Sequence, residues 1–143
     1  MKWFFDTSVL IPAFVEDHRD HDRCLAAYAP SNKRIACCAA HSLAEVYAGV
    51  TRLPGVFRAS SEQATLFLAD IEDHLTIVSL DSAEYLTTIR QAAANGIVGA
   101  TIYDALLAAC AMKARADTIY TDNERHFRMF GPEVASRVKR PGP

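Results

Sequence analysis

Residues 3–11, WFFDTSVLI, contain the strongest indication of the fold, and Asp6 is their only charged side chain. The aromatic residues that open it are bulky and favour extended structure, so Lys2–Phe5 is predicted to form a buried strand. The polar residues Asp6–Ser8 are of the kind that begin helices, and Val9–Val15 is predicted to be a short helix. Asp6 is therefore expected where a strand ends and a helix begins. In open parallel α/β sheets, ligands bind at that edge.

Two further acids stand alone in apolar runs. Glu45 is the only charged residue in one such run, with histidine taken as neutral, and Asp104 is the only charged residue in another. Helix capping is a competing explanation, because Ser42–Glu45 and Thr101–Asp104 match the capping-box pattern and a cap contributes roughly 1 kcal/mol. The run that contains Glu45 already has a helical composition from residue 39 onward, so Glu45 is expected inside that helix.

Length and composition predict one globular domain over residues 1–143. Half of the 143 residues are hydrophobic and 22% are charged, which is typical of a chain that folds around a core. Acids, Gly or Pro interrupt every apolar run, so no membrane span is expected, and Asp6 interrupts the only candidate signal segment. The four cysteines form no CxxC pair and no metal-ligand spacing. These features predict a cytoplasmic protein whose cysteines are small buried hydrophobes.

Charge is distributed unevenly along the chain. Residues 1–112 carry 8 basic and 13 acidic side chains, a net charge of −5, whereas residues 113–143 carry 7 basic and 4 acidic ones, a net charge of +3. A basic end permits a phosphate-bearing partner, and a solvated tail explains it equally well. The same two explanations apply to Arg125, His126 and Arg128.

The order of predicted elements favours a parallel sheet. Strands separated by helices pair in parallel through right-handed crossovers, so the predicted class is α/β, with a central sheet of four to five strands and helices on both faces. The strands are expected at Lys2–Phe5, Arg34–Cys38, Leu75–Leu80 and Asp117–Thr121, with a short edge strand within Val134–Val138. The helices are expected at Val9–Val15, Arg19–Tyr28, Ala39–Leu53, Ser61–Asp73, from the cap Asp81 to about Asn95, at Ile102–Ala114 and at Glu124–Phe130.

The isolated acids, and the pair Asp122-Asn123, all fall at or near junctions that follow strands. In a parallel sheet those junctions share one edge, so the side chains are expected to converge. Two ionised carboxylates at ~4 Å repel by roughly 4 kcal/mol at a typical effective dielectric, so a buried group of them holds protons or cations. An all-oxygen set suits Mg²⁺ or Mn²⁺ rather than zinc, and such a site binds a phosphodiester and activates water. Neither a glycine-rich phosphate loop nor a supported Ser-His-acid set competes with this interpretation.

Four motifs in this order resemble those of a known family: Asp6–Leu10 after a hydrophobic strand, Glu45 in a helix, Asp104 in an Ala/Leu-rich helix, and T-x-N-x-x-x-F over residues 121–127. They are similar to the motifs of PIN-domain ribonucleases, and most of all to those of VapC toxins from bacterial type II toxin–antitoxin pairs. The resemblance covers nearly the whole chain. It implies a three-layer α/β/α sandwich, a Mg²⁺-dependent endoribonuclease, and a homodimer whose acidic pocket is blocked by a VapB-type antitoxin.

The resemblance also implies roles for individual residues. Asp6 and Asp104 would bind the metal most directly, and Glu45 would complete the metal shell or position water. The hydroxyls expected to hold water or phosphate belong to Thr7, Ser8 and Thr121.

One position departs from the family pattern. Where the family often has an aspartate, two residues after Thr121, this chain has Asn123. Asp122, the fourth candidate catalytic acid beside Asp6, Glu45 and Asp104, stands one residue early, and at a strand end one residue usually reverses the direction of the side chain. The sequence leaves open whether Asp122 or Asn123 faces the site, and therefore whether a second metal ion is held.

Two other functions remain open from the sequence. A non-catalytic RNA- or protein-binding module on the same fold would show no Mg²⁺-dependent cleavage and little effect of Asp6→Asn on binding. A metal-dependent phosphatase or DNA nuclease would be distinguished by competition between substrates.

Overall fold

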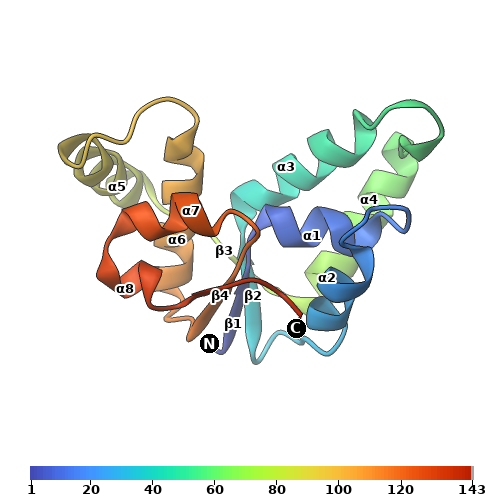
Figure 1. Ribbon diagram of the computed structural model, residues 1–143, viewed down its shortest axis with the longest axis horizontal. Helices are drawn as coiled ribbons and strands as arrows, with labels where there is room; N and C mark the ends of the chain where they lie inside the picture. Colours follow the sequence, from blue (N-terminus) through green and yellow to red (C-terminus); the bar gives the residue numbers. More distant parts are fainter. Residues whose placement is uncertain (143) are drawn as a thin grey trace.

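The core of the molecule is a parallel five-stranded sheet in the order β3-β2-β1-β4-β5, seen edge-on at the centre of Figure 1. The computed structural model describes residues 1–142. All four strand pairings are parallel, and the register aligns Phe4 with Cys37 on one side and with Ile119 on the other. The strands are β1 (Trp3–Phe5), β2 (Ala36–Ala39), β3 (Thr76–Val78), β4 (Thr118–Tyr120) and β5 (Val138–Lys139).

Helices cover both faces of this sheet. In Figure 1 the first four helices lie on one side of the strands and the last four on the other, which confirms the predicted α/β/α sandwich. The first layer contains α1 (Thr7–Phe14), α2 (His21–Tyr28), α3 (Ala40–Thr51) and α4 (Ser61–His74). The second contains α5 (Ser82–Ala94), α6 (Thr101–Lys113), α7 (Glu124–Phe127) and α8 (Pro132–Ala135), while short 3₁₀ turns lie at Gly55–Phe57 and Arg128–Phe130.

Alternation along the central strands builds two separate hydrophobic cores. Phe5 and Cys38 pack into the core beneath the first helical layer, whereas Phe4 and Cys37 pack into the core beneath the second. Successive strand residues point to opposite faces, and all four of these side chains are fully buried. Strands buried on both faces explain why these runs are apolar without interruption.

The C-terminal edge of the sheet differs from its prediction. An edge strand within Val134–Val138 was expected, but Pro132–Ala135 forms α8 and the strand is Val138–Lys139. Proline is favoured at the first position of a helix, where its missing N–H is not needed, and Pro132 occupies this position directly after Gly131. Val134 consequently faces the second core from a helix.

Strand order places a crevice beside β1. The chain proceeds from β1 outward to β2 and β3, then returns to the other side of β1 for β4 and β5. This reversal is the topological switch point, at which open α/β sheets bind ligands beyond the carboxyl ends of the strands. Asp6 follows β1 and Thr121 follows β4, so both residues flank the switch point.

Within residues 1–142, no helix combines the length and the apolar character needed to cross a membrane.

Candidate active site

Asp6 is a buried carboxylate held by two hydroxyls. It stands at the N-cap of α1 with extended backbone angles, yet its side chain makes no capping hydrogen bond, so capping does not explain it. Only 1% of the residue is exposed. Its Oδ2 atom instead accepts hydrogen bonds from Ser8 Oγ at 2.6 Å and from Thr121 Oγ1 at 2.8 Å. The tertiary fold thus fixes one face of this carboxylate.

Backbone amides orient both hydroxyls. The N–H of Asp122 donates to Ser8 Oγ at 2.9 Å, and the N–H of Asn123 donates to Thr121 Oγ1 at 2.9 Å. Each hydroxyl oxygen therefore accepts from the chain and directs its own proton to Asp6. A hydroxyl that both donates and accepts a hydrogen bond cannot rotate freely. The hydroxyl groups around Asp6 therefore have fixed orientations.

Glu45 lies inside α3, one turn beyond its beginning at Ala40. The Ser42 side chain caps nothing, so the capping-box explanation for Glu45 fails. Thr7 Oγ1 instead donates to Glu45 Oε1 at 2.8 Å and lies 2.9 Å from the buried Ser42 Oγ. Thr7 follows Asp6 directly, so this contact ties Glu45 to the same edge of the sheet.

Asp104 lies in the first turn of α6, whose N-cap residue is Ala100 rather than Thr101. Neither residue provides a side-chain cap, so the second capping explanation also fails. Asp104 Oδ2 is 2.9 Å from His126 Nδ1 on α7. A carboxylate only accepts, so Nδ1–H is the donor, and His126 fixes the direction of one Asp104 oxygen.

The negative charges of Asp104 and Glu45 act on the Asp6 carboxylate. Burial is the largest cause that raises the pKa of Asp6, from 3.8 to about 6. The hydrogen bonds from Ser8 and Thr121 lower this pKa, whereas the negative charges of Asp104 and Glu45 raise it further. The charges acting on Asp6 are thus both negative. A group of this kind stabilises a cation that enters it.

The donor set fits a hard divalent cation. Every candidate donor is oxygen, which suits Mg²⁺ or Mn²⁺. Within residues 1–142, no three His, Cys, Asp or Glu side chains lie close enough together to enclose a metal ion as they stand. Mg²⁺ commonly takes only one or two protein carboxylates and keeps several waters, so such an ion needs no complete protein shell.

Asp122 and Asn123 face different surroundings. The Asp122 carboxylate is bound by two arginines, with Arg23 Nη2 at 2.8 Å and Arg140 Nε at 3.3 Å from Oδ1. Asn123 is exposed, and its side chain does not cap α7. The Asp122 carboxylate is therefore directed to α2 and the C-terminal segment rather than to Asp6.

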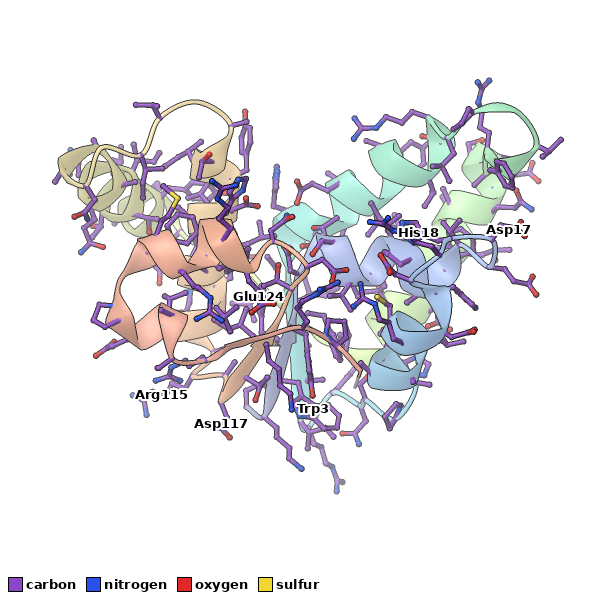
Figure 2. The ribbon with its side chains drawn as sticks, viewed as in Figure 1. Trp3, Asp17, His18, Arg115, Asp117 and Glu124 are labelled. Atoms are coloured by element: carbon purple, nitrogen blue, oxygen red, sulfur yellow. The ribbon has the colours of Figure 1, made fainter. Side chains whose placement is uncertain are left out.

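The amino ends of the strands lie at the opposite end of the molecule. Figure 2 shows Glu124, the first residue of α7, near the middle of the view, and Trp3 and Asp117 at the lower end of the sheet. A cavity of about 660 Å³ lies elsewhere, between α5, α6 and α8, and Glu133 is the one acid that lines it. The candidate acids thus share the carboxyl edge without lining this cavity.

Three partners in this region had no signal in the sequence. The sequence pattern indicates Ser42 only as a helix cap and His126 only as a candidate phosphate contact, and it gives no indication of Arg23. Arg23 lies 99 positions from Asp122 in the chain, and no local pattern relates the two. His126 and Asp104 are 22 positions apart and on different helices, so only the packing of α7 on α6 reveals their contact.

The fold and the acidic edge define a class of α/β proteins with a carboxylate group at the switch point, and comparison with known proteins identifies the family. The family model of the PIN domain matches residues 3–131. The chain is 35% identical over 117 residues to ribonuclease VapC27 of Mycobacterium tuberculosis, covering 82% of each protein. The chain therefore belongs to the PIN-domain family, among the VapC proteins.

Solved structures share this fold at low sequence identity. The crystal structure of VapC20 from Mycobacterium tuberculosis, described as a toxin that cleaves the sarcin–ricin loop, superposes with a TM-score of 0.71 at 13% identity, covering 87% of this chain and 92% of that one. VapBC2 from Rickettsia felis, bound to a DNA fragment from its promoter, gives a TM-score of 0.66 at 19% identity, covering 99% of this chain and 100% of that one.

Proposed function

We propose that this protein is a Mg²⁺-dependent endoribonuclease and the toxin of a type II toxin–antitoxin pair, with Mn²⁺ able to replace Mg²⁺. One observation carries the proposal: the Asp6 carboxylate is buried at the switch point, is bound by two hydroxyls, and experiences the negative charges of Asp104 and Glu45. The similarity to VapC27, which is named as a ribonuclease, supports RNA as the substrate. Hydrolysis adds one water molecule across a P–O bond of the RNA backbone, and the departing oxygen takes up a proton.

Each residue has a distinct part in this proposal. Asp6 and Asp104 would hold the ion directly, and Glu45, oriented by the Thr7 hydroxyl, would complete the shell or hold the attacking water. When bound, Mg²⁺ supplies charge stabilisation to the phosphodiester and lowers the pKa of water. Ser8 and Thr121 keep the Asp6 carboxylate in one orientation. The exposed Asn123 amide is available for a contact with water or phosphate.

The decisive experiment measures cleavage of RNA by the purified protein with Mg²⁺, with excess chelator, and after Mg²⁺ is restored. Asp6→Asn and Asp104→Asn are each expected to lower cleavage by about a thousandfold, because each removes a charge from the metal site. Asp117→Asn is the matched control, since Asp117 is exposed before β4 at the opposite edge of the sheet. Full activity in either site variant, or in excess chelator, would refute the proposal.

Substrate competition distinguishes the alternative activities. Unlabelled RNA is expected to suppress cleavage of labelled RNA, whereas duplex DNA and a phosphomonoester are expected to have little effect. Preferential competition by DNA or by the monoester would instead assign the acidic edge to a DNA nuclease or a phosphatase. Binding of RNA without any Mg²⁺-dependent cleavage would favour the non-catalytic module.

The proposal includes a cytoplasmic homodimer and a VapB-type antitoxin as partners. The likeness to the VapBC2 complex supports the antitoxin, and the half-exposed Leu86 and Ile89 on α5 support association. Co-expression with the product of the adjacent gene is expected to yield a stable complex that does not cleave RNA. Sedimentation of the isolated protein is expected to give twice the chain mass. A monomeric mass would exclude the homodimer. A product of the adjacent gene that leaves cleavage unchanged would exclude it as the antitoxin.

A further inference from the structure

Asp122 is neutralised by two arginines that come from distant parts of the chain. Arg23 on α2 and Arg140 near the C-terminus both donate to its Oδ1 atom, at 2.8 Å and 3.3 Å. The side chains of Arg23 and Asp122 are only 20% and 19% exposed, whereas that of Arg140 is 60% exposed. The Arg23 pair is therefore the better shielded of the two, and the stronger anchor for Asp122.

The backbone of Asp122 continues this network to Asp6. The Asp122 N–H donates to Ser8 Oγ at 2.9 Å, and Ser8 Oγ donates to Asp6 Oδ2 at 2.6 Å. The Arg23–Asp122 pair fixes the position of the turn from which this N–H points. A guanidinium on α2 is thus linked to the buried carboxylate through one ion pair and two hydrogen bonds.

The C-terminal segment completes the surroundings of Arg23. Arg23 Nη1 donates to the carbonyl oxygen of Pro141 at 3.2 Å. A Cβ added to Gly142 would lie 2.8 Å from Arg23 Cβ, so the segment passes too close to Arg23 for any larger residue there. Figure 1 shows the chain running from α8 across the sheet to end beside α2.

Each guanidinium nitrogen of Arg23 has an acceptor within the protein. Nε donates to Asp20 Oδ1 at 3.2 Å, Nη2 contacts Asp122, and Nη1 contacts Pro141. Arg23 is consequently anchored within the protein, because each of its three guanidinium nitrogens is directed at an acceptor of the chain.

We propose that Arg23 is a positioning residue for Asp6, acting through Asp122 and Ser8, and that the segment Lys139–Gly142 holds Arg23 in place. The inference rests on the proposed function, because it states what the orientation of Asp6 serves. It also assigns Asp122 to orientation of the site and leaves metal binding to Asp6 and Asp104. Groups that orient metal ligands are typically worth 10- to 100-fold in metal affinity or activity.

The test compares Arg23→Gln with Arg23→Lys and with the control Arg34→Gln. Arg34 is exposed and precedes β2 at the opposite edge of the sheet. Calorimetric titration with Mg²⁺ alone, without RNA, is expected to show about tenfold weaker binding for Arg23→Gln. RNA cleavage is expected to show kcat lowered to a similar degree with KM unchanged. Arg23→Lys is expected to keep most of the Mg²⁺ affinity and most of kcat. Arg34→Gln is expected to match the unaltered protein.

A double-variant cycle tests the route of the effect. If Arg23 acts through Ser8, then Ser8→Ala combined with Arg23→Gln should bind Mg²⁺ no more weakly than Ser8→Ala alone. If the losses of Mg²⁺ affinity add in the double variant, Arg23 does not act through Ser8. A raised KM with unchanged kcat would make Arg23 an RNA contact instead, and unchanged Mg²⁺ binding in Arg23→Gln would also overturn the proposal.

Hydrogen exchange separates this inference from the proposed function. Exchange of the Asp122 amide is expected to be faster in Arg23→Gln than in Arg34→Gln, while the Ile119 amide in β4 remains equally protected in both. This readout needs neither RNA nor metal, so it stands even if cleavage proves independent of Mg²⁺. Should Arg23→Gln fail to fold, Asp122→Asn replaces it, because it keeps the shape of the turn and removes only the charge. Unchanged exchange at residue 122 in the variant used would refute the network.

Discussion

Asp6 and Asp122 are two carboxylates on either side of the Ser8 hydroxyl, and they have opposite surroundings. Asp6 is 1% exposed, is bound by neutral hydroxyls, and experiences the negative charges of Asp104 and Glu45. Asp122 is partly exposed and is bound by Arg23 and Arg140. Both residues follow central strands of the sheet, so position along the fold does not distinguish them.

The difference lies in which charges the folded chain leaves uncompensated. An ion pair with arginine satisfies Asp122 within the protein, and its role is to hold the turn and the C-terminal segment. Burial among like charges leaves Asp6 in need of a proton or a cation. Burial without a cationic partner therefore indicates a metal-binding carboxylate better than position after a strand does.

The largest expected contrast is in RNA cleavage at saturating Mg²⁺. Asp6→Asn should lower kcat/KM by about a thousandfold, because it removes charge from the ion that stabilises the reacting phosphate. Asp122→Asn should lower it only about tenfold, because it affects orientation alone. Similar losses in the two variants would place both carboxylates at the metal and contradict a separate orienting role for Asp122.

The second contrast concerns stability as a function of pH, in the absence of metal. The folded-state pKa of Asp6 is raised from 3.8 to about 6, so the folded protein binds more protons than the unfolded chain between these values. The contribution of Asp6 to the free energy of unfolding therefore falls as pH rises through this window. Above about pH 6 the buried carboxylate is charged, and that charge is unfavourable. Asp6→Asn should be more stable than the unaltered protein at pH 7, by on the order of 3 kcal/mol.

Urea unfolding of both proteins from pH 4 to pH 7.5 measures this difference. The advantage of Asp6→Asn should be small near pH 4 and grow toward pH 7, and saturating Mg²⁺ should reverse much of it by binding only the unaltered protein. An advantage that does not change with pH would mean that Asp6 carries no charge penalty. Asp122→Asn should show no such gain.

A smaller effect is expected at Glu45. Thr7→Val removes the hydroxyl that donates to Glu45 Oε1 while keeping the shape of the buried side chain. Cleavage should fall about tenfold, because Glu45 loses the contact that orients it. Thr7→Ser should recover most of the activity since it restores the donor. Equal rates for the Val and Ser variants would show that Glu45 needs no orientation from Thr7.

The smallest effects are expected in the arginine pair itself. Arg140 is mostly exposed, so Arg140→Gln should lower the free energy of unfolding by less than about 0.5 kcal/mol, and less still in high salt. Arg23→Gln should cost about 1–2 kcal/mol, because Arg23 is better shielded and also bonds the C-terminal segment. Urea unfolding at low and high ionic strength measures both. A larger loss of stability in Arg140→Gln than in Arg23→Gln would make Arg140 the stronger partner of Asp122.

Much of the fold was predictable from local pattern. The run Trp3–Phe5 and the strand that contains Cys37 and Cys38 are apolar enough to require burial on both faces, which favours a parallel sheet covered by helices. The edge strand was the exception, because Pro132 turned a β-prone run into a helix start. The order of strands, with β4 returning beside β1, had no local signal because strand pairing joins residues more than one hundred positions apart.

The sequence by itself determined which side chains stand alone: Asp6, Glu45 and Asp104 are isolated acids in apolar runs, and their residue types are enough to indicate oxygen ligands for a hard cation. The direction in which each carboxylate points depends instead on the folded chain. The two hydroxyls on Asp6, the His126 contact of Asp104 and the arginines on Asp122 are set by packing between distant elements. The physical reason is that residue type and spacing establish the chemistry of a side chain, whereas its partners, and hence its charge state and orientation, depend on which distant segments the folded chain brings into contact with it.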